Sequence, residues 1–224
     1  MRFLIRSAMP RTGPFNQFTD QYEDWFAKNR SVFQSELNAL RKVVPAEGRG
    51  IEIGVGSGIF ARPLGITEGV DPSAPMRARA RERDIHAVEG IAEALPFEDR
   101  SFDFAVMVTT ICFVDDPERS LQEANRILID SGTLVMGFVD KDSPVGKKYL
   151  EHREESVFYK DAVFYGTDEL IGMMEKTGFG IREIHQTVFG ELEQVRSVQE
   201  SLKGYGKGSF VVIAADKINH FGHE

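Results

Sequence analysis

The sequence predicts an α/β fold in which a mostly parallel sheet is covered by helices on both faces. Short apolar runs, each ending in Gly or Asp, alternate with helical segments after about residue 46. This alternation is typical of parallel strands joined by helices. The runs are Gly50–Ile53, Thr67–Val70, Ile85–Val88, Phe102–Val108 and Thr133–Phe138. Ligands of such sheets bind at the carboxyl ends of the strands, so we expect a site there.

The segment before the first strand is predicted to be helical up to about Pro45. Large apolar side chains recur there at three- and four-residue steps, as on the buried face of a helix. They are Trp25, Phe26, Val32, Phe33, Leu37 and Leu40.

Two later helices have clear end signals. Asp116 can cap the first, which is followed by a short turn at Gly132 and then by the next strand. The second begins at Thr167 and ends at Gly178, a natural left-handed cap. Two late strands are expected at residues 181–188 and 210–214.

Composition narrows the set of partners. The 224 residues have a formal net charge of −8, whereas nucleic-acid binders usually present a basic face. The arginines between Arg77 and Arg83 are predicted to be a solvated helix face. Cys112 is the single cysteine, so no internal disulfide is expected. No apolar run approaches the roughly 20 residues that cross a bilayer. We therefore expect a cytoplasmic protein with no membrane span, no nucleic-acid partner and no metal site.

The most specific local feature is a strand that leads directly into three alternating glycines, Gly54, Gly56 and Gly58. Glycine is needed where a backbone turns tightly or contacts a ligand with no Cβ between them. A dinucleotide fingerprint would need glycine where Ile59 stands, and a phosphate-binding loop would need a lysine. The loop therefore favours a cofactor site over a plain turn, but it fits a dehydrogenase poorly.

The next strand ends at Asp71, and the spacing of this acid from the glycine loop is the second sign of a cofactor site. In nucleoside-binding βαβ units, an acid near this spacing accepts hydrogen bonds from ribose hydroxyls. Alternatively, Asp71 caps the helix that follows Pro72 and Ser73. Both roles are compatible.

These segments, in order, resemble the motifs of class I S-adenosylmethionine-dependent methyltransferases, in the branch related to ubiquinone-biosynthesis methyltransferases. The matching segments are Glu52–Gly58, Gly69–Ser73 with Met76, Gly90–Phe97 with Ser101–Asp103, Pro117–Gly132 and Thr177–Phe179. The resemblance implies a Rossmann-like three-layer sandwich whose seven-stranded sheet has an antiparallel last strand. It also implies a single methyltransferase domain over residues 1–224 and S-adenosylmethionine as the cofactor.

The resemblance also implies roles for individual residues. Glu52 would orient the loop and approach the amino end of the cofactor, beside the backbone of Gly54 and Gly56. Asp71 would hold the ribose and Pro72 would lie against adenine.

Two more positions are assigned to the cofactor by the resemblance. Ala92 would offer its N–H to the adenine edge, and Thr109 would lie near the methionine carboxylate. The family often has Asp where Ile91 stands, so the side-chain acceptor for the adenine amino group is missing. The chain between Gly58 and Asp71 contains Pro63 and Gly65, which predict a short or irregular first helix.

No catalytic residue can be assigned from the sequence. Family members often carry two histidines where Cys112 and Phe113 stand, so no catalytic histidine is carried over there. His86 is expected to be a core residue, while His152 and His185 could equally be surface residues. Methyl transfer from a sulfonium needs no acid for the leaving group, and a base only if the acceptor must first lose a proton.

The acceptor is predicted to be a small, apolar or aromatic molecule that is methylated on nitrogen or oxygen. Residues 1–45 and 141–166 would form a lid over the cofactor-binding core at 46–140, and 167–215 would complete the core. Aromatic side chains in these segments suit a desolvated pocket, although they could simply close the core. The candidate acceptor residues are Tyr22, Trp25, Cys112, Phe113, Tyr149 and Tyr165.

The sequence leaves two alternative functions open. The first is a catalytically inactive module that binds S-adenosylmethionine, which the absence of Asp at Ile91 favours slightly. The second is a nicotinamide-dependent oxidoreductase, which Ile59 opposes.

Overall fold

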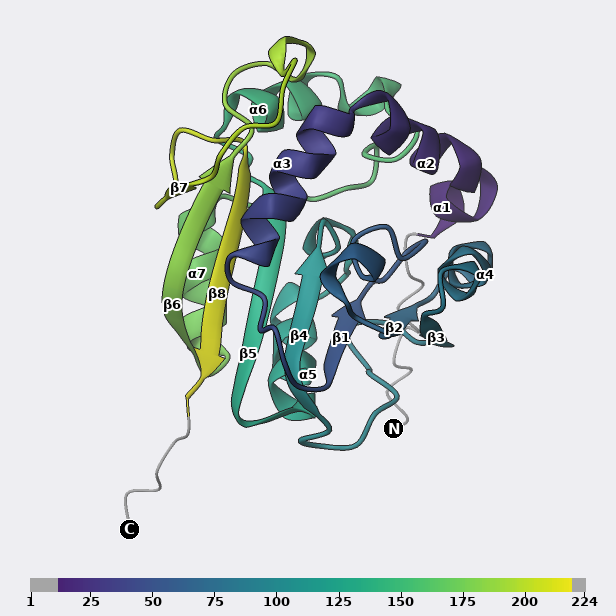
Figure 1. The fold of residues 1–224 in the computed structure, drawn as a ribbon, viewed down its shortest axis with the longest axis vertical. Coiled ribbons are helices and arrows are strands. Elements are labelled where there is room, and N and C mark those ends of the chain that lie inside the picture. The colour runs from purple at the N-terminus through teal and green to yellow at the C-terminus, as the bar shows by residue number, and fades with distance from the viewer. Residues whose placement is uncertain (1–11, 219–224) are drawn as a thin grey trace, which may run out of the picture.

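The computed structural model describes residues 12–218, and these form a mixed sheet between layers of helices (Figure 1). Within this range the sheet has eight strands in the order β3-β2-β1-β4-β5-β8-β6-β7. The strands are β1 (Gly50–Ile53), β2 (Glu68–Asp71), β3 (His86–Glu89), β4 (Phe102–Val108), β5 (Leu128–Val139), β6 (Phe179–Thr187), β7 (Leu202–Lys203) and β8 (Phe210–Lys217).

The pairing confirms the predicted α/β class and the antiparallel last strand. Strands β1 to β5 pair in parallel, whereas β8 is antiparallel to both β5 and β6. The strand count is corrected, because the described chain has eight strands instead of seven. The additional strand, β7, pairs antiparallel with β6, and both of its residues are exposed, so no apolar pattern marks it in the sequence.

Helices cover both faces of the sheet. In Figure 1, α3 lies in front of the sheet, and α5 and α7 lie behind it. The helices are α1 (Gly13–Gln17), α2 (Thr19–Lys28), α3 (Arg30–Arg41), α4 (Ala74–Glu82), α5 (Pro117–Ile127), α6 (Pro144–Glu151) and α7 (Thr167–Lys176). Short 3₁₀ turns are η1 (Arg62–Leu64), η2 (Ile111–Phe113), η3 (Arg153–Glu155) and η4 (Leu192–Gln194). Three helices thus precede β1, in agreement with the predicted helical segment.

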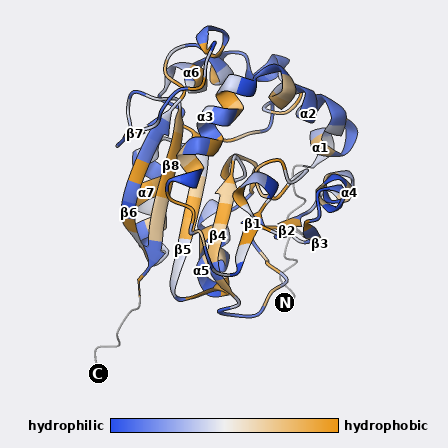
Figure 2. Cartoon of the chain, viewed as in Figure 1, coloured by the Kyte–Doolittle hydropathy of each residue, from blue (hydrophilic) through white to orange (hydrophobic). Residues whose placement is uncertain are grey.

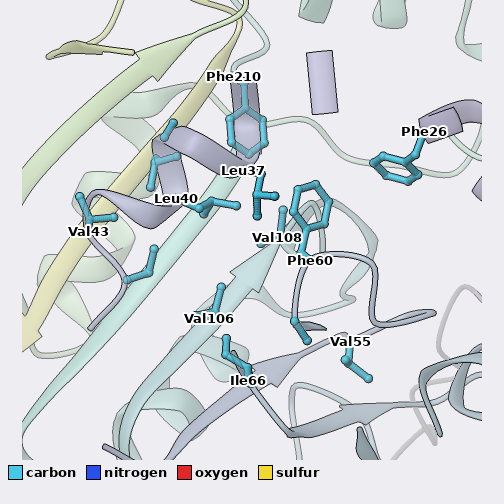
Figure 3. Close-up of a cluster of buried hydrophobic side chains, with 14 of the residues drawn as sticks. Phe26, Leu37, Leu40, Val43, Val55, Phe60, Ile66, Val106, Val108 and Phe210 are labelled. Carbon is cyan, nitrogen blue, oxygen red and sulfur yellow. The ribbon is translucent and has the colours of Figure 1, made fainter. Parts of the chain in front are cut away.

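The core has two apolar clusters, one on each face of the sheet. Val106 and Val108 of β4 pack in the cluster that contains Leu37 and Leu40 of α3 (Figure 3). Met107 belongs to the cluster on the α5 and α7 side. Side chains alternate between faces along a strand, so the nearly continuous apolar run of β4 serves both clusters. Figure 2 shows apolar residues along β4, whereas α4 is mostly hydrophilic.

Most element boundaries lie close to the predicted ones, and one differs clearly. The helix α5 ends at Ile127 and β5 begins at Leu128, so the predicted turn at Gly132 is wrong and Gly132 lies inside the strand. A register shift opposite Phe102 and Phe104 accommodates residues 129–132 in the ladder. The predicted short first helix is confirmed, because only the turn η1 stands between the glycine loop and β2. Within residues 12–218, no helix has both the length and the apolar character to cross a membrane.

Candidate cofactor and acceptor site

The glycine loop continues from the carboxyl end of β1. Gly54 and Gly56 have φ angles of 73° and 52°, a region that residues with a Cβ rarely adopt. A Cβ on Gly54 would stand 2.3 Å from the Thr110 side chain. The N–H groups of Gly54 and Val55 donate to the Val70 carbonyl at 2.8 and 3.0 Å, which holds the loop against β2. Both glycines line the main cavity of the protein.

Asp71 ends β2 beside this loop. Its Oδ2 accepts a hydrogen bond from the Gly56 N–H at 2.9 Å, and its Oδ1 accepts one from the Ser73 N–H at 2.8 Å. Burial raises the pKa of Asp71, and these two N–H donors oppose the shift. The N-cap of α4 is Ser73, whose hydroxyl accepts from the Met76 N–H. Asp71 and Pro72 both line the cavity.

Glu52 is buried in β1, with 2% of its surface exposed. Burial raises the pKa of Glu52 well above its ordinary value, an N–H donor at Ala61 opposes this, and the charge of Asp71 adds to it. Its Oε2 has no hydrogen-bond partner among the described residues. Glu52 is not part of the cavity lining, so its approach to the amino end of the cofactor stays a prediction.

The remaining residues predicted to bind the cofactor line the same cavity. Ala92 is buried and Ile91 is half-buried, and Ile91 forms an isolated bridge with Ala94. Thr109 has a φ of 48°, and its N–H donates to the Gly137 carbonyl at 2.7 Å. A threonine in this left-handed region is strained, and such strain often occurs at binding sites. The structure therefore brings Ile91, Ala92 and Thr109 together with Asp71.

Aromatic rings form much of the remaining lining. Tyr22 and Trp25 of α2, Phe113 of η2 and Tyr149 of α6 all line the cavity. Phe15 of α1 packs edge-on against Phe113, with 4.9 Å between ring centroids. The N-terminal helices therefore meet the segment after β4 at the cavity, whereas the lid formed with residues 141–166 stays a prediction.

Cys112 and Tyr165 differ in position from the other predicted acceptor residues, and their role stays a prediction. They line a second, smaller cavity, together with Phe164 and other side chains, and not the main one. The turn η2 directs neighbouring side chains to different sides, so Phe113 enters the main cavity while the Sγ of Cys112 lies 3.3 Å from the Thr109 carbonyl.

Glu36, which is not among the predicted site residues, also lines the main cavity. It lies in α3, four positions after Val32 and four before Leu40, and is therefore on the buried stripe of the helix. Only 7% of its surface is exposed, and burial raises the pKa of Glu36 from 4.5 to about 8. The sequence does contain a sign of this residue, because Glu36 is an acid at a position where the helix pattern predicts burial. A search for apolar residues alone does not find it.

The histidines do not form part of this site within residues 12–218. His86 is exposed, so its predicted core placement is wrong, because β3 is an edge strand with one outer face. His185 is buried, and its Nε2 lies 3.0 Å from the Oε2 of Glu183. His152 is exposed. The described residues contain no group of three or more His, Cys, Asp or Glu that could hold a metal ion.

The helix α2 is tied to the glycine loop by an arginine. Arg83 contacts both oxygens of Glu23, at 2.7 and 2.8 Å, and also donates to the Ser57 carbonyl at 2.9 Å. A second ion pair joins Arg79 of α4 to Asp20 of α2. The side chains of Glu23 and Arg83 are 25% and 29% exposed, so water screens this pair only in part.

Comparisons with known proteins agree with this geometry. A family model described as a methyltransferase domain matches residues 51–136. A crystal structure from Thermotoga maritima, of a protein described as an S-adenosylmethionine-dependent methyltransferase and a possible histamine N-methyltransferase, is 48% identical. Its TM-score is 0.90, and the match covers 92% of this chain and 99% of that one.

Two further proteins are similar to this chain in sequence. An uncharacterised protein of Methanocaldococcus jannaschii is 41% identical over 91% of this chain and 98% of its own length. A 2-methyl-6-phytyl-1,4-hydroquinone methyltransferase of Oryza sativa is 31% identical over 58% of this chain and 38% of its own length. Three findings support the same family: the glycine loop, the acid at the end of β2, and a relative matched over nearly its whole length. The chain belongs to the class I S-adenosylmethionine-dependent methyltransferases, and S-adenosylmethionine is its cofactor.

Proposed function

We propose that the protein transfers a methyl group from S-adenosylmethionine to a nitrogen or oxygen atom of a small apolar or aromatic molecule. The observation that supports this most directly is the composition of one cavity. Gly54, Gly56 and Asp71 line it together with Tyr22 and Tyr149. A methyl donor on the glycine loop and an acceptor among the rings would therefore share one enclosed space.

The residues at the loop fit the cofactor. The backbone at Gly54 leaves no room for a Cβ, and the Oε2 of Glu52 is buried without a partner. Asp71 would hold the ribose hydroxyls, Ala92 would face the adenine edge, and Thr109 would lie near the carboxylate of the methionine portion. The cofactor supplies a methyl carbon activated by a sulfonium, with a neutral thioether as the leaving group.

The chain itself would orient the acceptor and exclude water. The aromatic side chains of residues 12–45 and 141–166 provide rigid apolar walls, because each ring buries a large area with little loss of conformational freedom. Phe158 lies 5.5 Å from Phe15 and 6.0 Å from Tyr22, measured between ring centroids, so the two segments meet. Proximity and desolvation of this kind are the main contributions that a methyltransferase needs to make.

The test is release of S-adenosylhomocysteine over a library of acceptors. Small phenols, amines and quinone-like compounds are compared with RNA and protein substrates, and imidazole amines are included because of the Thermotoga relative. Turnover confined to small molecules is expected. Activity only on RNA or protein would contradict the proposed acceptor class. Cofactor binding without any turnover would favour the inactive binding module.

A further inference from the structure

Glu36 is a buried acid that faces the acceptor region. Its carboxyl group lines the main cavity, and its charge adds to burial in raising the pKa of Tyr22, Tyr149 and Tyr159. These three tyrosines come from α2, from α6 and from the segment before α7. Glu36 therefore lines the same cavity as tyrosines from three separate elements.

Among the described residues, Glu36 also lacks a structural partner. Within residues 12–218, no hydrogen bond or ion pair reaches its carboxyl group, and burial is the cause of its raised pKa. Glu123 is buried to a similar degree, yet Arg126, Arg119 and the Leu95 N–H all donate to it. A buried acid without a charged or hydrogen-bonding partner destabilises a fold, so a role in ligand binding is the physical reason to have one there.

We propose that Glu36 binds the amino group of the methyl acceptor, and that the acceptor is therefore a small amine with an apolar or aromatic body. This inference rests on the proposed function. A bound ammonium lowers the pKa of Glu36, so the carboxyl group loses its proton and the resulting carboxylate attracts the ammonium strongly. The faces of the surrounding tyrosine rings also favour a cation. The same charge would repel phenolates and carboxylates, which narrows the acceptor from nitrogen or oxygen to nitrogen.

The assignment also provides a route for the proton. An ammonium nitrogen has no lone pair, so it must lose a proton before it can attack the methyl carbon. Glu36 accepts that proton, the neutral nitrogen forms the new N–C bond, and the S–C bond breaks with its electron pair going to sulfur. The product leaves as a methylated ammonium, and the Glu36 carboxyl then releases its proton to solvent. Burial raises the pKa of Glu36, so its carboxylate is a stronger base in this cavity than it would be in water, which favours the transfer.

The test compares matched amines and alcohols on the protein saturated with S-adenosylhomocysteine. Phenethylamine, tryptamine and histamine are each paired with the alcohol that replaces the amino group by hydroxyl, and calorimetry measures binding. We expect the amines to bind at least about tenfold more tightly than their alcohols, which corresponds to one ion pair in a desolvated site. Alcohols that bind as well as the amines, or a set of amines that does not bind, would overturn the proposal without any variant.

Two variants complete the experiment. Glu36→Gln keeps the shape and removes the charge, so the preference for amines should disappear while affinity for S-adenosylhomocysteine is unchanged. Asp24→Asn on the exposed face of α2 is the matched control and should keep the preference. A Glu36→Gln variant that still prefers amines contradicts the role of Glu36. A different result would contradict the proposed function itself: S-adenosylmethionine would bind, but no acceptor of any class would be methylated.

Discussion

Pairing separates the buried glutamates of this protein into two kinds. Glu123 is held by Arg126 and its neighbours, and these hydrogen bonds keep its pKa below the ordinary range in spite of burial. Glu36 and Glu52 are buried with few or no donors, and burial raises the pKa of both. The paired acid supports the fold. Of the two poorly paired acids, Glu52 precedes the glycine loop and Glu36 lines the aromatic cavity.

Glu36→Gln is expected to stabilise the unliganded protein, and more so as the pH rises from 4.5 to about 8. The folded chain holds a proton on Glu36 in this window, because its pKa is raised from 4.5 to about 8, whereas the unfolded chain has lost it. The wild-type free energy of unfolding therefore falls through the window by at most about 1.4 kcal/mol per pH unit from this group. Urea unfolding of both proteins across this pH range measures the difference, and a constant difference would contradict the prediction.

Asp71→Ala is expected to weaken binding of S-adenosylmethionine by about tenfold or more, because a hydrogen bond to a charged group contributes about 1.5–3 kcal/mol. The variant also leaves the N–H groups of Gly56 and Ser73 without their acceptor, so some loss of stability accompanies it. Asp71→Asn keeps one oxygen acceptor and separates the two effects. Calorimetry on protein shown by circular dichroism to be folded is the measurement. Unchanged affinity would mean that Asp71 only shapes the loop.

At the scale of elements, α2 is attached to the cofactor half of the molecule through α4. Arg83 joins Glu23 to the Ser57 carbonyl, and Arg79 joins Asp20, so two ion pairs span α2 and α4. Tyr22 lies between these acids along α2, and its hydroxyl would be 3.9 Å from a Cβ placed on Gly56. The position of α2 and the geometry of the glycine loop are therefore linked by the same few contacts.

Glu23→Ala is expected to loosen α2 and so to speed the dissociation of S-adenosylhomocysteine. The partly buried pair with Arg83 should contribute about 1 kcal/mol, since it is a two-oxygen contact that water screens incompletely. Asp24→Ala, on the exposed side of the same helix, should leave the dissociation rate unchanged. Stopped-flow release of the ligand measures both variants. Equal rates would show that the ion pair does not hold the lid against the loop.

At the scale of the whole molecule, the main cavity lies between the sheet and the helices on the α3 side of it. Its lining draws on α2, α3, β4 and the segments that follow β1, β2 and β3. Folding must therefore be largely complete before the site exists, and a ligand that binds there stabilises the entire fold.

S-adenosylmethionine and S-adenosylhomocysteine are each expected to raise the melting temperature. At a hundredfold excess over the dissociation constant, mass action adds about 2.7 kcal/mol to the free energy of unfolding. Differential scanning fluorimetry on protein freed of carried-over ligand measures the shift, and a nicotinamide dinucleotide serves as the control that should have no effect. Absence of a shift at millimolar ligand would contradict the prediction.

The sequence by itself determined the features that depend on neighbouring residues. The alternating glycines need positive φ angles wherever they occur, as Gly54 and Gly56 show, and Asp116 accepts the Arg119 N–H as a helix cap. The apolar run of β4 predicts a strand buried on both faces, because its pattern does not depend on which elements cover it. The α/β class and the order of the cofactor segments follow from such local signals.

Only the tertiary structure decided which distant residues meet. Phe15, Phe113 and Phe158 come from three separate segments, yet their rings pack together, and no local pattern could pair them. The same holds for Glu36, whose position on the α3 stripe was visible in the sequence but whose lack of a partner was not. Burial and pairing are properties of the surroundings and not of the residue. For that reason the sequence determined the glycine loop, whereas the packing of the N-terminal helices and of residues 141–166 on the core decided the aromatic cavity.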